Sequence, residues 1–165
     1  MADIVDSATR SRMMSGIRSK NTSPELFLRK GLHSLGFRYR LHVKELPGKP
    51  DMVFPRYGAL IEIYGCFWHN HGCRYCKLPA TNARRWENKI RENHARDQRN
   101  LGALLEAGWR CLVVWECAIR KSRRSPNELD SIQLVTQWLR TGGRFAAIDE
   151  GGLHSLKKKL KESHV

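Results

Sequence analysis

The chain has 165 residues, and its 30 Lys and Arg against 16 Asp and Glu give a formal net charge of +14. This length allows one domain whose core needs no disulfides, and this charge favours nucleic acid as a partner. No apolar run in the sequence approaches the ~20 residues of a membrane-spanning helix, and the N-terminus lacks the apolar core of a signal peptide. We therefore expect a cytoplasmic protein without membrane contact, whose five cysteines are reduced.

Residues 1–20 are polar and basic, and we expect them to form a mobile arm that orders on a phosphate backbone. Asp6 or Ser7 can cap a short helix over residues 9–18. The two methionines of that helix are either core fillers or flexible apolar probes on a binding surface.

Residues 21–150 are expected to form a single domain, followed by a basic, solvated tail over residues 151–165. A helix over residues 23–36 is indicated by a Ser-Pro start and a terminal Gly. Glu25 lies in its first turn, where the positive helix end is a sufficient structural explanation for an acid.

The rest of the domain reads as strands and helices in alternation. Strands are predicted over residues 37–43, 51–54, 59–64, 109–115 and 145–148. Helices are predicted over residues 81–107 and 125–141. This order gives an α/β fold with a mixed β-sheet flanked by helices.

Two acids are expected on neighbouring strands. Asp51 follows a proline at the start of one strand, and Glu62 lies near the end of the next. Two converging carboxylates make an oxygen-ligand site for Mg²⁺, which can activate water and offset charge on a leaving oxygen. The alternative is that Glu62 faces solvent; alternation places it on the same face as Leu60 and Tyr64.

Four thiols and imidazoles follow that strand within a short loop: Cys66, His71, Cys73 and Cys76. Clusters of this kind are typical of a closed structural Zn²⁺ site, which would hold an irregular loop with little apolar surface. Cys117 follows a predicted core strand and can reach the same place, so that either Cys76 or Cys117 is surplus. Cys111 lies inside that strand and is expected to be a buried apolar residue.

Phe67 and Trp68 lie between a candidate zinc ligand and His69. On a loop of a basic protein, aromatic rings can stack on bases or wedge between base steps, worth ~1–3 kcal/mol per stacked base. The alternative is that the rings pack around the loop. His69 is either a hydrogen-bonded structural histidine or a general base.

The predicted long helix carries two polar residues, Asn93 and Asp97, on an otherwise apolar stripe. Because buried polar groups need partners, these two side chains point at the candidate catalytic centre, unless the stripe drifts and both are solvated.

Several of these residues occur together in a known family. The segments concerned are Pro50-Asp51, Gly65-Cys66-Phe67-Trp68-His69 with His71 and Cys73, Lys77-Leu78-Pro79-Ala80-Thr81, and Val114-Trp115-Glu116-Cys117. Over residues 1 to about 120 the chain resembles the very short patch repair (Vsr) endonucleases. The resemblance implies a restriction-endonuclease-like fold and a DNA mismatch endonuclease with catalytic Mg²⁺ and structural Zn²⁺. It would nick 5′ to the T of a T:G mismatch that arises from deaminated 5-methylcytosine.

The resemblance also implies roles for single residues. Asp51 would bind metal, His69 would act as general base or position water, and Glu25 and Asp97 would be supporting acids. The implied zinc ligands are Cys66, His71, Cys73 and Cys117, which leaves Cys76 spare. The implied DNA-intercalating residues are Phe67, Trp68, Trp86 and Met14.

The sequence departs from the family at two positions. Glu62 stands where the family usually has an apolar residue, and Tyr64 stands where His or Asp is frequent. This resembles the wider restriction-enzyme pattern of Pro-Asp followed by Glu-x-Lys, so we expect Glu62 to bind Mg²⁺ together with Asp51.

Two alternatives to the mismatch endonuclease stay open from the sequence. One is a zinc-stabilised DNA-binding module without catalysis, and the other is a nuclease of broader mismatch or restriction specificity, which Glu62 favours. We expect a monomer that acts on double-stranded DNA with a T:G mismatch, with mismatch-repair proteins as candidate partners.

Overall fold

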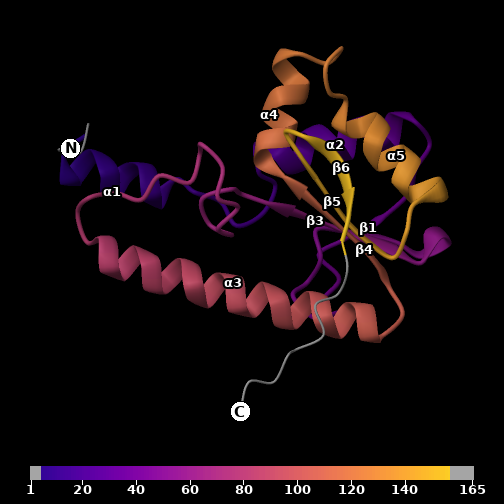
Figure 1. The fold of residues 1–165 in the computed structure, drawn as a ribbon, viewed down its shortest axis with the longest axis horizontal. Coiled ribbons are helices and arrows are strands. Elements are labelled where there is room, and N and C mark those ends of the chain that lie inside the picture. Colours follow the sequence, from indigo (N-terminus) through magenta and orange to yellow (C-terminus); the bar gives the residue numbers. More distant parts are fainter. Residues whose placement is uncertain (1–4, 157–165) are drawn as a thin grey trace.

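The computed structural model describes residues 5–156, so that predictions about residues 1–4 and 157–165 lie outside it. The helices are α1 (Ser7–Ser15), α2 (Ser23–Ser34), α3 (Ala83–Glu106), α4 (Glu116–Arg124) and α5 (Ser131–Thr141), with a short 3-10 turn η1 (Pro55–Tyr57) (Figure 1). The strands are β1 (Arg40–Leu41), β2 (Met52–Phe54), β3 (Ala59–Tyr64), β4 (Arg110–Trp115), β5 (Phe145–Asp149) and β6 (Gly152–Ser155). No helix within this part of the chain is both long and apolar enough to cross a membrane.

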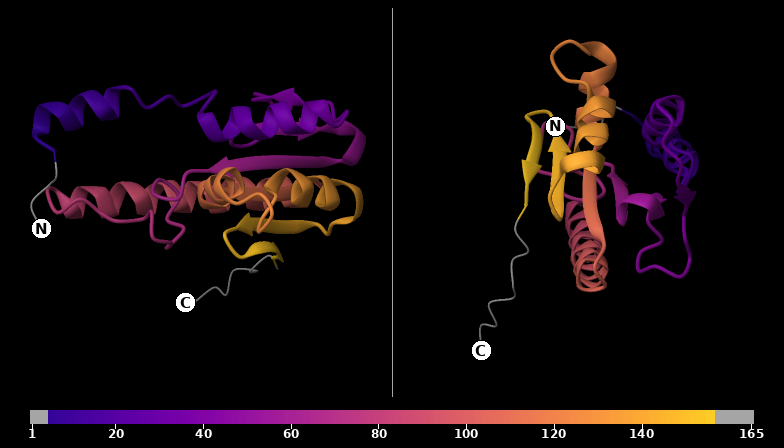
Figure 2. Two further views of the ribbon diagram at one scale, coloured as in Figure 1. Left: turned by 90° about the horizontal axis from the view of Figure 1, so that it is seen from above. Right: turned by 90° about the vertical axis from the view of Figure 1, so that its right-hand side faces the viewer.

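The strands form one mixed sheet in the order β1-β2-β3-β4-β5-β6. The central strands β3, β4 and β5 are parallel, and the outer pairs are antiparallel. Helix α3 lies along one face, whereas α2, α4 and α5 lie on the other (Figures 1 and 2). The predicted mixed α/β sheet flanked by helices is therefore confirmed.

Successive side chains of β3 pack into two separate hydrophobic cores, one on each face of the sheet. Leu60 and Tyr64 pack towards α3 with residues such as Leu104, whereas Ile61 packs in the opposite core with residues such as Trp138. Each of these side chains is at most 7% exposed. Burial on both faces fixes the register of β3, so the residues at its C-terminal end have defined positions.

The observed helices and strands differ from the prediction at residues 37–43 and in the second half of the chain. Helix α4 was not expected, because its sequence is short and strongly basic; it buries Ala118 and Ile119 against the sheet. The helix predicted from residue 125 begins only after Asp130, whose side chain accepts a hydrogen bond from the Gln133 N–H and caps α5. The predicted strand over residues 37–43 shrinks to the two residues of β1.

The sheet continues past the boundary expected at residue 150, because residues 152–155 of the predicted tail form strand β6. The Gly151 N–H donates to Asp149 Oδ1 (2.7 Å), and Gly152 has a φ of 103°. This left-handed turn suits glycine and returns the chain to pair with β5.

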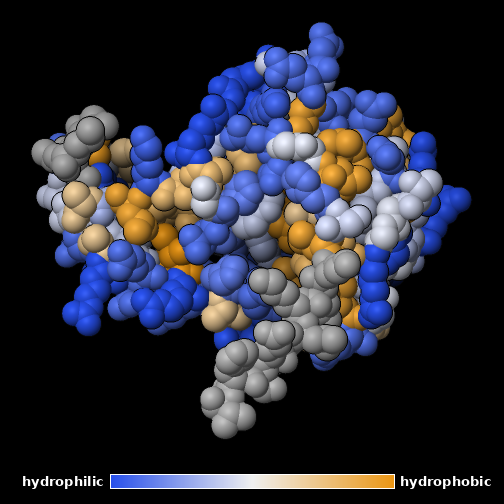
Figure 3. Space-filling view, viewed as in Figure 1, coloured by the Kyte–Doolittle hydropathy of each residue, from blue (hydrophilic) through white to orange (hydrophobic). Residues whose placement is uncertain are grey.

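The N-terminal segment forms α1, which has no buried residue and is capped by the Asp6 side chain. Both α1 and the N-terminal half of α3 extend beyond the sheet on the same side (Figures 1 and 2). Apolar side chains gather between them and are bordered by hydrophilic ones, as Figure 3 shows. The surface there combines apolar and charged character.

Candidate active site and metal centre

A cleft of about 640 Å³ opens at the C-terminal end of β3, between α3 and the segment that joins α1 to α2. Five acids line it: Glu25, Asp51, Glu62, Asp97 and Glu116. Two histidines line it as well, His42 and His69. Its basic lining residues are Arg18, Lys20, Lys49, Lys89 and Arg96. The cleft therefore offers acids that can hold a cation, with positive charge nearby that can contact phosphate.

Asp51 lies immediately before β2, and its Oδ2 accepts a hydrogen bond from the Ile63 N–H at 2.7 Å. Its other oxygen, Oδ1, lies 3.8 Å from His42 Nδ1. Burial, together with the nearby charge of Glu25, raises the pKa of Asp51 to about 6. The carboxylate is thus held in a fixed orientation but poorly solvated, an environment that a divalent cation would relieve.

Glu25 is 4% exposed and has several hydrogen-bond donors around it. The Asn21 N–H and the Thr22 hydroxyl donate to it at 3.0 and 2.9 Å, and Arg29 donates at 2.6 Å. Glu25, His42 and Asp51 offer ligand atoms that lie within 4.8 Å of one another. Glu25 therefore has the structural role expected at the start of α2 and also belongs to the acid cluster.

Glu62 is only 8% exposed, so the alternative of a solvent-facing strand residue is wrong. Burial, reinforced by the charges of Asp51 and Asp97, raises its pKa. It is not part of the close group formed by Glu25, His42 and Asp51. The predicted pair of Asp51 and Glu62 thus shares a cleft, while the compact group around Asp51 is completed by Glu25 of α2 and His42 of the loop after β1.

His69 and Asp97 meet across the cleft wall, with His69 Nδ1 2.5 Å from Asp97 Oδ2. The ring of Tyr64 stacks on that of His69, with centroids 4.1 Å apart and planes 6° from parallel. Asn93, one turn before Asp97, donates to the Trp68 carbonyl at 3.1 Å. Both polar residues of the α3 stripe therefore bind the loop after β3, as one of the two sequence interpretations expected.

The thiol and imidazole cluster assembles as the resemblance implied. Ligand atoms of Cys66, His71, Cys73 and Cys117 lie within 4.8 Å of one another. Such a set of three sulfurs and one nitrogen fits a tetrahedral Zn²⁺ site. A hydrogen bond from the Cys66 thiol lowers the pKa of Cys117 to about 6, which favours the thiolate form that binds metal.

Cys76 lies outside this group. Its thiol donates to the Cys66 carbonyl at 3.0 Å, and its sulfur is 3.9 Å from that of Cys73. Cys111 is fully buried in the core beside α3, as expected. The structure thus favours Cys117 over Cys76 as the fourth member of the cluster.

Three aromatic rings meet next to the cluster. Phe67, Trp68 and Trp86 have ring centroids 5.1 to 5.8 Å apart, and the Lys89 ammonium lies 5.6 Å from the Trp68 ring. Met14 lies on α1 and is half-buried. The structure therefore brings together the three predicted aromatic residues, while Met14 comes from a separate helix.

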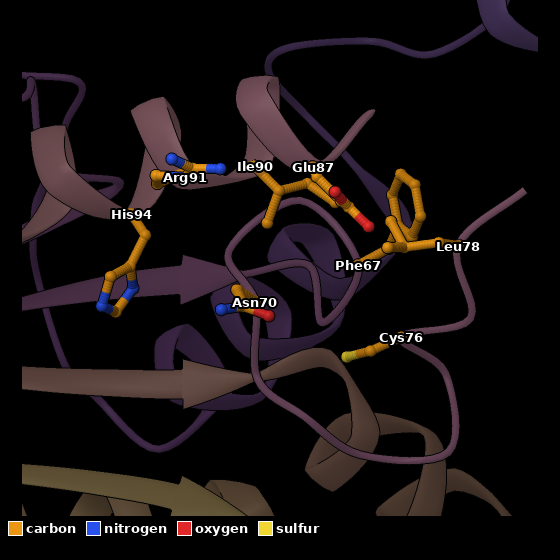
Figure 4. Close-up of a pocket in the computed structure, with 8 residues that line it drawn as sticks. All are labelled: Phe67, Asn70, Cys76, Leu78, Glu87, Ile90, Arg91 and His94. Carbon is orange, nitrogen blue, oxygen red and sulfur yellow. The ribbon is translucent and has the colours of Figure 1, made fainter. Parts of the chain in front are cut away.

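A second, smaller hollow of about 320 Å³ lies beside Phe67. In Figure 4, Phe67 and Leu78 stand together at one end, and His94 stands at the other. The Cys76 side chain also lines this hollow rather than the acidic cleft.

Sequence reasoning missed His42 and its partner Arg29. Arg29 Nη2 lies 3.0 Å from His42 Nε2, and His42 has a φ of 47°. A histidine just after a two-residue strand, paired with an arginine of a preceding helix, leaves no periodic signal in the sequence. Only the fold brings the two together.

Comparison with known proteins identifies the family. A model of the family described as DNA mismatch endonuclease Vsr matches residues 2–75. The DNA mismatch endonuclease Vsr of Escherichia coli is 41% identical over 156 residues, covering 94% of this chain and 99% of that protein. The Type II nicking enzyme V.XorIIP of Xanthomonas oryzae is 49% identical over 119 residues, covering 72% of this chain and 88% of the relative.

A third relative, the Type II nicking enzyme V.NmeAIP of Neisseria meningitidis, is 42% identical over 120 residues, or 73% of this chain and 86% of that protein. The family match over residues 2–75 includes Glu25, Asp51 and His69 of the cleft. Such relatives rule against a DNA-binding module without catalysis. The chain belongs to the DNA mismatch endonuclease Vsr family and is an endodeoxyribonuclease.

Proposed function

We propose that this protein is a Mg²⁺-dependent endonuclease that nicks double-stranded DNA 5′ to the T of a T:G mismatch. The observation that carries the proposal is the placement of the His69–Asp97 pair in the same cleft as Asp51. The names of the relatives, a DNA mismatch endonuclease and Type II nicking enzymes, agree with it. The mixed sheet, with Asp51 just before β2 and Glu62 near the end of the antiparallel β3, supports a restriction-endonuclease-like fold.

Asp51 is the proposed principal Mg²⁺ ligand, with Glu25 and Glu62 as further acids of the site. The donor set fits a hard cation, because buried carboxylates with raised pKa values gain most from added positive charge. Bound Mg²⁺ would supply positive charge that stabilises the leaving oxygen and acidifies water.

His69 is the proposed general base. Asp97 accepts the Nδ1–H, so that Nε2 keeps its lone pair and can take a proton from water. The stacked Tyr64 ring limits rotation of the imidazole. Asp97 thereby fixes both the tautomer and the position of the base, in the manner of the acid in a catalytic triad.

Mismatch recognition is assigned to the aromatic cluster. A T:G pair is easier to unstack than a regular pair, so inserted rings would select it by the lower cost of deformation. Phe67, Trp68 and Trp86 provide these rings, with Met14 reaching in from α1. Arg96, Lys89 and the basic residues before α2 would contact phosphates on either side.

The Cys66, His71, Cys73 and Cys117 cluster is proposed to hold a structural Zn²⁺. Cys66 directly precedes Phe67 and Trp68, so a metal at this point would fix the loop that carries both the aromatic rings and His69. We therefore assign the metal a role in positioning and no direct role in cleavage.

Cleavage of end-labelled duplexes tests the proposed function. Wild-type protein with Mg²⁺ should nick one strand of a T:G duplex and leave the matched T:A duplex intact, and Asp51→Asn should abolish nicking of the T:G duplex. Absence of nicking across varied flanking sequences would refute the mismatch activity. Equal cleavage of T:G, other mismatches and paired DNA would instead favour the broader nuclease, for which the buried Glu62 is the supporting observation.

A further inference from the structure

His42 stands between the two acids at the centre of the cleft, and its partners restrict what it can do. Its Nε2 lies 3.0 Å from Arg29 Nη2 and 3.8 Å from Glu25 Oε2. Its Nδ1 lies 3.8 Å from Asp51 Oδ1. The imidazole therefore faces both members of the acid cluster and could be taken for a metal ligand.

The hydrogen bond from Arg29 argues against that role. A guanidinium group has donors and no acceptor, so His42 Nε2 must be the acceptor in this contact. A neutral imidazole with a free lone pair on Nε2 carries its proton on Nδ1. Neither ring nitrogen is then available to a metal unless the Arg29 contact breaks.

Arg29 is itself held in place. Its Nη2 donates to Glu25 at 2.6 Å and its Nη1 donates to the Asn21 side chain at 2.6 Å, and Arg29 is 6% exposed. The guanidinium cannot readily turn away to release the imidazole. The tautomer of His42 is thus set by a buried network that starts at α2.

The carboxylate of Asp51 completes the arrangement. One oxygen is fixed by the Ile63 N–H, while the other faces the Nδ1 side of His42. His42 reaches this point from a backbone with a φ of 47°, a left-handed conformation that is uncommon for residues other than glycine. Such backbone strain is concentrated at functional sites.

We infer that His42 is a positioning residue: a neutral imidazole, locked by Arg29 as the Nδ1–H tautomer, that donates towards Asp51 Oδ1 or a water bound there and does not ligate the metal. The inference rests on the proposed function, because it deepens the Mg²⁺ site of Asp51.

The tautomer can be observed without metal or DNA. Protein labelled with ¹⁵N-histidine would be studied by long-range ¹H–¹⁵N correlation at pH 7.5, and His42→Gln would assign the His42 signals. We expect Nδ1 to show the shift of a protonated nitrogen and Nε2 that of an unprotonated one. A ring protonated on Nε2, or on both nitrogens, would overturn the inference whatever the enzyme cleaves.

The role of His42 towards the metal requires a second measurement. The rise in melting temperature with Mg²⁺ or Mn²⁺ concentration would be recorded for the wild type, His42→Gln, His42→Leu and Asp51→Asn. Loss of such a positioning contact should raise the half-saturating Mg²⁺ concentration of His42→Leu by about 10–100-fold. His42→Gln should recover part of this loss, because its amide can accept from Arg29 and donate towards Asp51.

The choice of metals separates a positioning residue from a ligand. Imidazole favours transition metals, so removal of a ligating histidine would weaken Mn²⁺ much more than Mg²⁺. We expect the ratio of the half-saturating Mn²⁺ and Mg²⁺ concentrations to be the same for His42→Gln as for the wild type. A tenfold loss of affinity confined to Mn²⁺ would overturn the inference. It would also be overturned if His42→Leu bound Mg²⁺ as tightly as the wild type. If Asp51→Asn also matched the wild type, the metal assignment itself would fail, a result distinct from the His42 outcomes.

Discussion

Asp97 and His69 are 28 residues apart in the chain, yet Asp97 Oδ2 and His69 Nδ1 lie 2.5 Å apart. The long helix α3 carries Asp97 to the loop after β3, and Asn93 fixes the same loop through the Trp68 carbonyl. The pair therefore couples the rigid α3 scaffold to the histidine of the cleft.

We predict that Asp97→Asn lowers kcat for mismatch nicking by about 100-fold or more, because an amide no longer enforces the Nδ1–H tautomer of His69. Single-turnover cleavage of a T:G duplex measures this, together with DNA affinity, which should change little. Glu92→Gln is the matched control: it makes the same chemical change on an exposed turn of α3. Nicking by Asp97→Asn within about twofold of wild type would show that His69 needs no carboxylate partner.

The aromatic cluster gives a prediction about recognition. Trp68→Ala should weaken binding to a T:G duplex by ~1–3 kcal/mol, or about 5–150-fold, because a stacking surface is lost. Binding to the matched T:A duplex should fall much less, since electrostatic contacts dominate there. Tyr75→Ala provides an aromatic control on the same loop, whose ring contacts Arg74 and Arg120 and not the cluster. Equal losses on both duplexes would contradict a role in mismatch selection.

The zinc proposal is tested by two cysteine variants. Cys117→Ser should lose stoichiometric zinc and lower the melting temperature by about 10 °C or more, because the loop after β3 loses its anchor. Cys76→Ser should keep one zinc per chain, since Cys76 lies outside the four-residue group. Elemental analysis and thermal unfolding of both proteins give the answer, and zinc loss from Cys76→Ser alone would exchange the roles of the two cysteines.

Local patterns in the sequence indicated much of this site. The loop thiols, the adjacent aromatic pair and the interrupted stripe of α3 are all visible as spacing along the chain, and the fold brings each set together. The sequence left open whether Cys76 or Cys117 completes the zinc site, because only the parallel pairing of β3 with β4 determines which of the two sulfurs reaches Cys66.

Other features depend on contacts without periodicity. Helix α4 is too short and basic to stand out, and its apolar side is recognised only when the sheet is present. His42 depends on a left-handed backbone and on Arg29, so no rule of spacing connects it to Asp51. Tertiary contacts thus determine the part of the site that orients the acids.

The buried acids should also make the metal-free protein less stable as the pH rises. A carboxyl whose pKa is higher in the folded state holds more protons when folded, so the free energy of unfolding falls as the pH rises through the window between the two values. For Asp51 that window runs from 3.8 to about 6. At about 1.4 kcal/mol per unit, the full cost above pH 6 is about 3 kcal/mol.

Asp51→Asn removes this buried charge while its side-chain oxygen can still accept the Ile63 N–H. We predict that, without metal, the variant is more stable than the wild type at pH 8, by up to about 3 kcal/mol or about 6–12 °C in melting temperature. The difference should shrink as the pH falls below 6, since the wild-type carboxyl then becomes neutral.

Mg²⁺ should raise the melting temperature of the wild type only. A variant that is less stable than the wild type at pH 8 would contradict this, because it would mean that Asp51 stabilises the fold as a charged group and that no cation is needed to offset its burial.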